Sequence, residues 1–213
     1  RYVNAHIDYE SKQKHGTKIQ RCFVTTNNKS GIYKDVINNG IINFTDDSVH
    51  WMKFIVKDFV GNTTELMLKV KSSSSKISGE FVSKLPIYNC LEEIKHEKED
   101  IKIKIPAEAL YENTHFYCTQ NGSAPLTFSP LYQIMNDNIP LQKAITLSIK
   151  AVSLPDSLQS KACIVSVNKK GGKSYEGGAF ADGWVTTQTK EFGNYAVGID
   201  TIAPKLKLAF KTV

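Results

Sequence analysis

The chain has 213 residues, 41% of them hydrophobic, with 10 Phe and 9 Tyr, which is enough for a buried core in one large or two ordinary domains. Such a composition excludes an intrinsically disordered chain. The formal charge of +6 is only mildly basic, and Arg1 and Arg21 are the only arginines, so nucleic-acid binding is not expected.

The ends of the chain suggest a piece of a longer protein. The sequence starts at Arg1 without Met, and residues 205–213 read as the start of a further strand. No stretch is long enough for a transmembrane helix, and no signal peptide is recognisable. In a fragment, the missing signal says nothing about export.

The four cysteines are far apart and include no CxxC pair, which argues against a zinc ribbon. If the chain is exported, three disulfide pairings remain open. Buried free thiols inside strands are the favoured interpretation. The residues concerned are Cys22, Cys90, Cys118 and Cys163.

Segments with strand-type residues follow one another along the chain. Their spacing, with Gly, Pro, Asn and Ser between them, favours antiparallel β-sandwiches over βαβ units. Between two of them, Gly61 and Asn62 predict a hairpin turn, and Trp51 just before it is expected in the core. The expected strands are 19–25, 40–44, 49–59, 64–71, 76–82, 101–105, 115–120, 144–151, 162–167, 184–189 and 195–199.

Two further segments have a different character. Residues 106–112 begin with proline and predict a single helical turn. Residues 92–100 carry mixed charges and predict a solvated loop or short helix. Lys170 to Ser174 resembles a phosphate loop only superficially, because it lacks the upstream glycine, and it predicts a hairpin turn.

The fold class that follows is all-β, with two consecutive antiparallel β-sandwich (Ig-like) modules. The run of four serines at 72–75 gives the boundary between the two modules. We expect a first module at 1–71, short enough for a sandwich to suggest truncation at its start, a linker at 72–75, and a larger module with a short helical turn at 76–202. Residues 203–213 would be a second linker followed by the further strand.

Catalytic signatures are weak. His6 and Asp8 have alternate spacing, so on a strand they would share one face and could contribute to a metal site, although a surface hydrogen bond is the commoner role. His115 and Cys118 are three residues apart, which on a strand places them on opposite faces and leaves the thiol unactivated.

Exposed aromatic side chains could form a carbohydrate-binding platform. Most aromatic residues in strands are expected in the core. Trp184 follows a turn and Tyr175 lies in a glycine-rich one, so these two are the candidate ligand-binding residues.

Several short motifs occur in an order typical of one group of proteins. They are NAHIDY at 4–9, IQRCF at 19–23, GIINF at 40–44, DFVGN at 58–62, IPAEALY at 105–111, PL at 140–141, FGNY at 192–195 and DTIAP at 200–204. Together they resemble the region downstream of the catalytic domain in M23-family (lysostaphin-like) zinc peptidases of Bacteroidetes-type bacteria. The resemblance spans nearly the whole chain.

The resemblance implies a parent enzyme that cleaves peptidoglycan cross-links. Its catalytic zinc would be held by an HxxxD-type pair and an HxH motif, neither of which this chain contains, so no catalytic or metal-binding residue is carried over. The chain would be a non-catalytic accessory region without a cofactor of its own, in an extracytoplasmic protein at the cell envelope. Spacing, substrate positioning or anchoring on peptidoglycan or another envelope glycan would be its role.

Two alternatives remain open. The first is a stand-alone surface glycan-binding or adhesin-type β-sandwich, which Trp184 and Tyr175 on one flat face would favour. The second is an enzyme in its own right that uses an unrecognised cluster of His and acidic residues.

Overall fold

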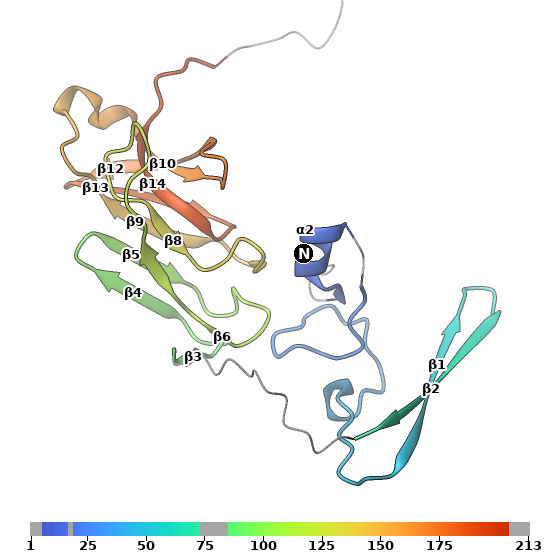
Figure 1. The fold of residues 1–213 in the computed structure, drawn as a ribbon. Coiled ribbons are helices and arrows are strands. Elements are labelled where there is room, and N and C mark those ends of the chain that lie inside the picture. The colour runs from blue at the N-terminus through green and yellow to red at the C-terminus, as the bar shows by residue number, and fades with distance from the viewer. Residues whose placement is uncertain (1–5, 17–18, 73–84, 205–213) are drawn as a thin grey trace, which may run out of the picture. The chain divides into compact units, whose positions relative to one another are not determined.

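A computed structural model describes residues 6–16, 19–72 and 85–204 (Figure 1). The chain divides into two compact units. The sandwich unit comprises Arg1–Lys34 with Lys84–Val213, and the hairpin unit comprises Asp35–Ser83. This division differs from the expected modules at 1–71 and 76–202. The expected strand at 76–82, the linker residues 73–75 and the segment 205–213 lie outside the described residues.

Two five-stranded antiparallel sheets form the sandwich unit. The first sheet has the order β12 (Ala179–Ala181), β13 (Trp184–Thr189), β9 (Ile145–Lys150), β5 (Ile101–Ile105) and β4 (Ile94–Lys98). The second sheet has the order β11 (Lys173–Gly177), β10 (Ala162–Val167), β14 (Gly193–Ile199), β8 (Tyr132–Ile134) and β7 (Cys118–Gln120). A small pair, β3 (Ile87–Tyr88) with β6 (Thr114–His115), and a 3-10 helix, η2 (Asp156–Lys161), also belong to the unit.

The main core lies between these sheets. In β5 every second residue is buried, because successive side chains of a strand point to opposite faces. The register pairs Ile101 with Ile149 and Ile103 with Leu147, so both strands present their buried side chains to the same face. Ile164 and Val197 of the second sheet belong to the same cluster. The all-β, antiparallel, sandwich-type fold is therefore confirmed.

The second sheet is also covered on its outer face over β10 and β14. Val165, Val167 and Ala196 are buried there, against Ala124 and Leu131 of the segment that joins β7 to β8. This second, smaller cluster makes β10 buried on both faces, with only Ser166 of its residues less than fully buried.

The hairpin unit contains β1 (Val49–Lys57), β2 (Thr63–Lys71) and a 3-10 turn, η1 (Asn38–Gly40). The predicted hairpin turn is confirmed: the N–H of Asp58 donates to the Asn62 carbonyl at 3.0 Å, and Gly61 adopts a φ of 101°. One expectation is wrong, because Trp51 is 64% exposed. Residues 35–72 form no covering layer over either face of the hairpin, and none of them is buried.

The N-terminal segment belongs to the sandwich unit. Its helix α2 (Tyr9–His15) is capped by Asp8, whose carboxylate accepts a hydrogen bond from the Ser11 N–H at 2.7 Å. The expected strands at 19–25 and 40–44 are wrong. Gln20 makes an isolated bridge to Ile7, and 41–44 has no strand partner among the described residues.

Two local expectations in the sandwich unit are also corrected. Residues 106–112 form a turn rather than a helix, because Glu108 has a φ of 64°, outside the right-handed helical region. Residues 92–100 contain β4, an edge strand whose Ile94 is buried while Lys95 and Glu97 lie on the outward face. The expected turn at 170–174 is confirmed between β10 and β11.

Candidate binding site

A cavity of about 540 Å³ opens at one end of the second sheet. Three segments line it, and they are far apart in the sequence. They are 133–137, which leaves β8, 166–170, which leaves β10, and 191–195, which enters β14. In this sheet β14 lies between β10 and β8 and is antiparallel to both. The ends of β10 and β8 and the start of β14 therefore meet at the same end of the sheet. This volume is in the usual range for small-molecule sites.

The floor of the cavity is apolar and fixed. Met135, Val167, Phe192 and Tyr195 line it and are all buried. The Tyr195 hydroxyl donates to the Glu191 carbonyl at 2.8 Å, and burial raises the pKa of Tyr195 to about 12. The phenol is therefore neutral at physiological pH and has no evident role as an acid or base.

Local backbone conformation shapes this floor. Met135 has a φ of 52°, and its N–H donates to the Tyr117 carbonyl at 3.1 Å. The Tyr117 N–H in turn lies 3.3 Å from the Met135 sulfur. Gly193 begins β14 with a φ of 155°, which an L-residue rarely adopts. These contacts hold the chain where it leaves β8 and enters β14.

The rim of the cavity is polar and balanced in charge. It carries two acidic side chains, Asp137 and Glu191, and two lysines, Lys169 and Lys170. The Asn168 carboxamide builds the turn beneath the lysines, because its oxygen accepts hydrogen bonds from the N–H groups of Lys170 and Gly172, both at 2.9 Å. The remaining rim side chains are mainly amides, which both donate and accept hydrogen bonds: Gln133, Asn136 and Asn194.

The structure does not bring the two predicted aromatic residues together. Tyr175, 48% exposed, lies on β11 opposite Val165, and therefore on the outer face of the second sheet. Trp184 starts β13 and precedes the core residue Val185, so it lies on the outer face of the first sheet. There Lys102 Nζ is 4.5 Å from the centroid of its ring. The two side chains share no platform.

The two residue pairs that the sequence suggested as reactive or metal-binding were His6 with Asp8 and His115 with Cys118. His6 Nδ1 is 3.3 Å from the Tyr33 hydroxyl, while Asp8 caps α2 and lies 3.9 Å from Arg21. His115 and Cys118 lie in different sheets, and burial raises the pKa of Cys118 to about 11. All four cysteines carry free thiols. Within the described residues, no group of three or more His, Cys, Asp or Glu side chains could hold a metal ion.

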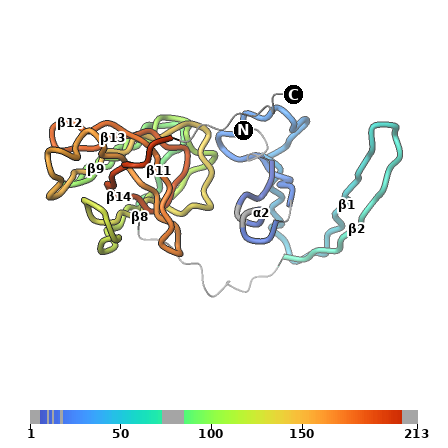
Figure 2. Tube along the Cα trace, turned by 90° about the horizontal axis from the view of Figure 1, so that it is seen from above, coloured from blue at the N-terminus to red at the C-terminus, as the bar shows by residue number. Residues whose placement is uncertain are grey.

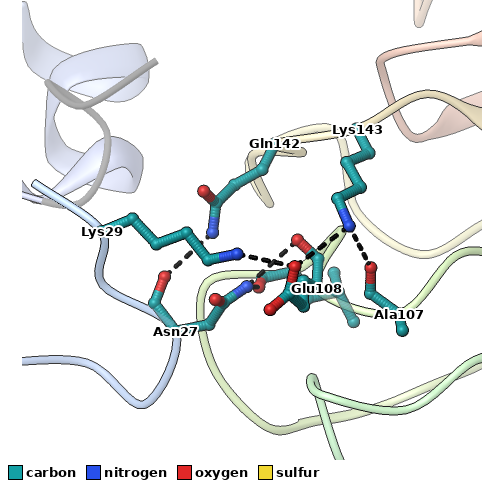
Figure 3. A network of polar contacts seen from close by, with 7 residues as sticks. Asn27, Lys29, Ala107, Glu108, Gln142 and Lys143 are labelled. Atoms are coloured by element: carbon teal, nitrogen blue, oxygen red, sulfur yellow. Dashed lines mark hydrogen bonds and ion pairs between the residues drawn. The ribbon is translucent and has the colours of Figure 1, made fainter.

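A polar network ties the N-terminal segment to the sandwich (Figure 3). Asn27 is only 3% exposed, and its amide nitrogen donates to the carbonyls of Glu108 at 3.0 Å and Leu110 at 2.6 Å. Gln142 Nε2 donates to the Asn27 carbonyl at 3.0 Å. Nearby, the Glu108 carboxylate bridges Lys29 at 2.6 Å and Lys143 at 3.2 Å, and both lysines lower its pKa. The network therefore positions the loop that carries Glu108 and Leu110 against the N-terminal segment.

Sequence reasoning missed both the cavity and Asn27. For the cavity, a signal exists in hindsight: the rim residues follow or precede strands whose ends meet, and they include asparagine and glycine typical of turns. No local signal distinguishes Asn27 from its neighbour Asn28, because its role depends on carbonyls about 80 residues away.

A family model described as the Zu5-like domain matches residues 87–200, which contain both sheets of the sandwich. No curated protein matches the chain. No helix in the described residues has the length and hydrophobicity needed to span a membrane. A fold-family match carries no activity with it. Since the matched segment is more than half of the 213 residues, the chain belongs to the Zu5-like domain family.

Proposed function

We propose that this chain is a non-catalytic accessory region of an exported peptidoglycan peptidase, and that it positions a piece of the wall polymer. The order of motifs along the sequence supports the peptidase context. The end cavity, with its apolar floor and balanced polar rim, is the observation that supports binding. Catalysis and its zinc would be supplied by another part of the parent protein.

The chemistry of the cavity suits a wall fragment. Peptidoglycan carries sugar hydroxyls and acetamido groups together with peptide amines and carboxylates. Amide side chains at Gln133, Asn136 and Asn194 can pair with the neutral groups, since each both donates and accepts. Acidic and basic groups on the same rim can pair with the ends of a peptide.

The test is binding of purified soluble muropeptides, measured by calorimetry or by NMR shifts. We expect Asn194→Ala, and separately Glu191→Gln, to weaken binding by about tenfold, because each removes a polar contact worth roughly 1–2 kcal/mol. Lys190→Ala is the matched control, because Lys190 is exposed and adjacent to Glu191 but does not line the cavity. Absence of binding, or binding that the cavity variants leave unchanged, would refute the proposal.

A second candidate function, a surface glycan-binding module, draws support from Trp184. Its ring lies on the outer face of the first sheet, where the neighbouring hydroxyls of Ser148 and Thr186 are 2.7 Å apart. An aromatic ring beside hydroxyl groups suits a sugar face. Trp184→Ala would abolish glycan binding on this hypothesis and leave it unchanged if the end cavity is the site.

A further inference from the structure

The β1–β2 hairpin has two chemically different faces. Antiparallel pairing places Met52 opposite Leu68 and Phe54 opposite Leu66, and residues two apart on either strand share a face. One face, which we term the apolar hairpin face, is therefore made of Met52, Phe54, Val56, Leu66, Leu68 and Val70, with His50 and Thr64 at its ends. All the charged strand residues lie on the other face, the lysine hairpin face, which consists of Lys53, Lys57, Glu65, Lys69 and Lys71 together with Val49, Trp51, Ile55, Thr63 and Met67.

The lysine hairpin face is suited to water. Lys53 and Glu65 form an ion pair at 2.7 Å across the two strands. Lys69 Nζ lies 5.8 Å from the centroid of the Trp51 ring. Lysine and glutamate side chains interrupt the apolar residues of this face, of which Trp51 is 64% exposed, so the face is mixed rather than continuously apolar.

The apolar hairpin face is different, because it carries no charged residue and the described residues of its unit leave it partly exposed. Val56 is 68% exposed and Leu66 is 56% exposed. At one end of this face, Phe44 stacks on His50 with ring centroids 4.4 Å apart, which lengthens the face slightly. The two strands form a long ribbon (Figure 2), and an isolated two-stranded hairpin is at best marginally stable in water. A second layer is needed to cover it.

We infer that a second copy of this chain covers the apolar hairpin face, with the two hairpins packed face to face about a two-fold axis. Such packing is self-complementary: it brings six apolar side chains of each copy together and buries no lysine. All the lysines of both hairpins stay on the two outer surfaces, so like charges are kept apart. The result is a small two-layer β-sandwich shared between copies.

The size of the contact is consistent with weak, specific pairing. Twelve medium to large apolar side chains would bury on the order of 1,000 Å² in total, which is at the lower end for specific interfaces. We therefore expect a dimer that dissociates on dilution. This inference concerns a surface separate from the end cavity, and it stands or falls independently of the proposed function.

The experiment is sedimentation velocity of the 213-residue chain over a range of about 1 to 100 μM, with a reducing agent because Cys22 is exposed. The wild-type chain should shift from monomer to dimer across this range. Leu66→Gln should weaken the dimer by at least about tenfold. Met67→Gln is its matched control, since Met67 is the next residue, is 47% exposed and lies on the lysine hairpin face.

A second pair of variants guards against loss of the hairpin itself. Threonine keeps the branched shape that favours strands, so Val56→Thr should weaken the dimer while Ile55→Thr, on the opposite face, should not. A chain that stays monomeric throughout, leaving the face to a different polypeptide, would overturn the inference. A dimer that resists both Leu66→Gln and Val56→Thr, or that is weakened equally by the controls, would overturn it too.

Discussion

The sandwich unit and the hairpin unit use similar strands with different outcomes. In β5, isoleucine alternates with lysine, and every isoleucine is buried because a second sheet lies over it. In β2, leucine and methionine alternate with polar residues less regularly, and none of these side chains is buried. Alternation therefore determines which residues share a face, whereas burial requires a second layer. The predictions that follow use this difference.

The largest contrast should come from truncating one isoleucine in each unit. Ile103→Ala removes a side chain that is 1% exposed between the sheets, and should lower the free energy of unfolding by about 2–5 kcal/mol. Ile55→Ala in the hairpin should change the stability of the sandwich by less than about 0.5 kcal/mol. Urea denaturation followed by circular dichroism measures both. Similar losses in the two variants would mean that the units unfold together.

Asn27→Ala should have the next largest effect, because Asn27 joins the N-terminal segment to the sandwich. The change leaves the carbonyls of Glu108 and Leu110 without this donor, and should cost about 1–3 kcal/mol of unfolding free energy. Lys29→Ala removes only a solvent-exposed ion pair and should cost much less. If both variants were as stable as the wild type, the segment would not be an integral part of the sandwich unit.

A smaller effect, restricted to mildly acidic pH, is expected from His96 in β4. Burial lowers the pKa of His96 below its ordinary value of 6.5, and its Nε2 has no hydrogen-bond partner among the described residues. The unfolded chain therefore takes up the proton first. Stability from this group is complete above the ordinary pKa and is lost as the pH falls below it.

The test compares the free energy of unfolding at about pH 7.5 and pH 5.5, on either side of the ordinary histidine pKa. Between these two pH values, His96→Leu should lose less unfolding free energy than the wild type. The other titrating groups contribute equally to both chains, so their contribution cancels when the two losses are subtracted. His50→Leu is the control in the hairpin unit, where the imidazole is partly exposed and 2.8 Å from Asp46. An unchanged loss in His96→Leu would contradict the prediction.

The smallest effect is expected at the hairpin turn. The Asp58 carboxylate accepts hydrogen bonds from the N–H groups of Val60 at 3.0 Å and Asn62 at 2.9 Å. Asp58→Ala should increase amide hydrogen exchange in β1 and β2, because a less ordered turn opens more often, while leaving exchange in β5 unchanged. Faster exchange in β5 would show that the turn supports more than its own hairpin.

Sequence reasoning located the strands that carry strong alternation or a continuous apolar run. The expected bounds of 101–105, 162–167 and 184–189 agree with β5, β10 and β13. It failed at β4, where lysine, glutamate and histidine surround a single buried residue, Ile94. An edge strand needs only one apolar face, and here that face is hardly visible in the sequence.

The failures at 40–44 and Trp51 have a different cause. Both are apolar, and the described residues of the hairpin unit provide no covering layer for them. A covering layer depends on chain segments that are distant in the sequence. The candidate site shows the same limit. Trp184 and Tyr175 were selected by local exposure signals, but the sheet to which each strand belongs was unknown, and the sheets place them on opposite outer faces.

The doubly covered second sheet also has a consequence for mutational tolerance. In β5 the outward positions, Lys102 and Lys104, can accept most polar residues, so about half of that strand is free to vary. β10 offers almost no such freedom, because Cys163 and Val165 are buried on one face and Ile164 on the other. At Gly198 on the adjacent strand, an added Cβ would lie 2.8 Å from a Val165 methyl carbon. A saturation library scored for folding should therefore show alternating tolerance along β5 and nearly uniform intolerance along β10.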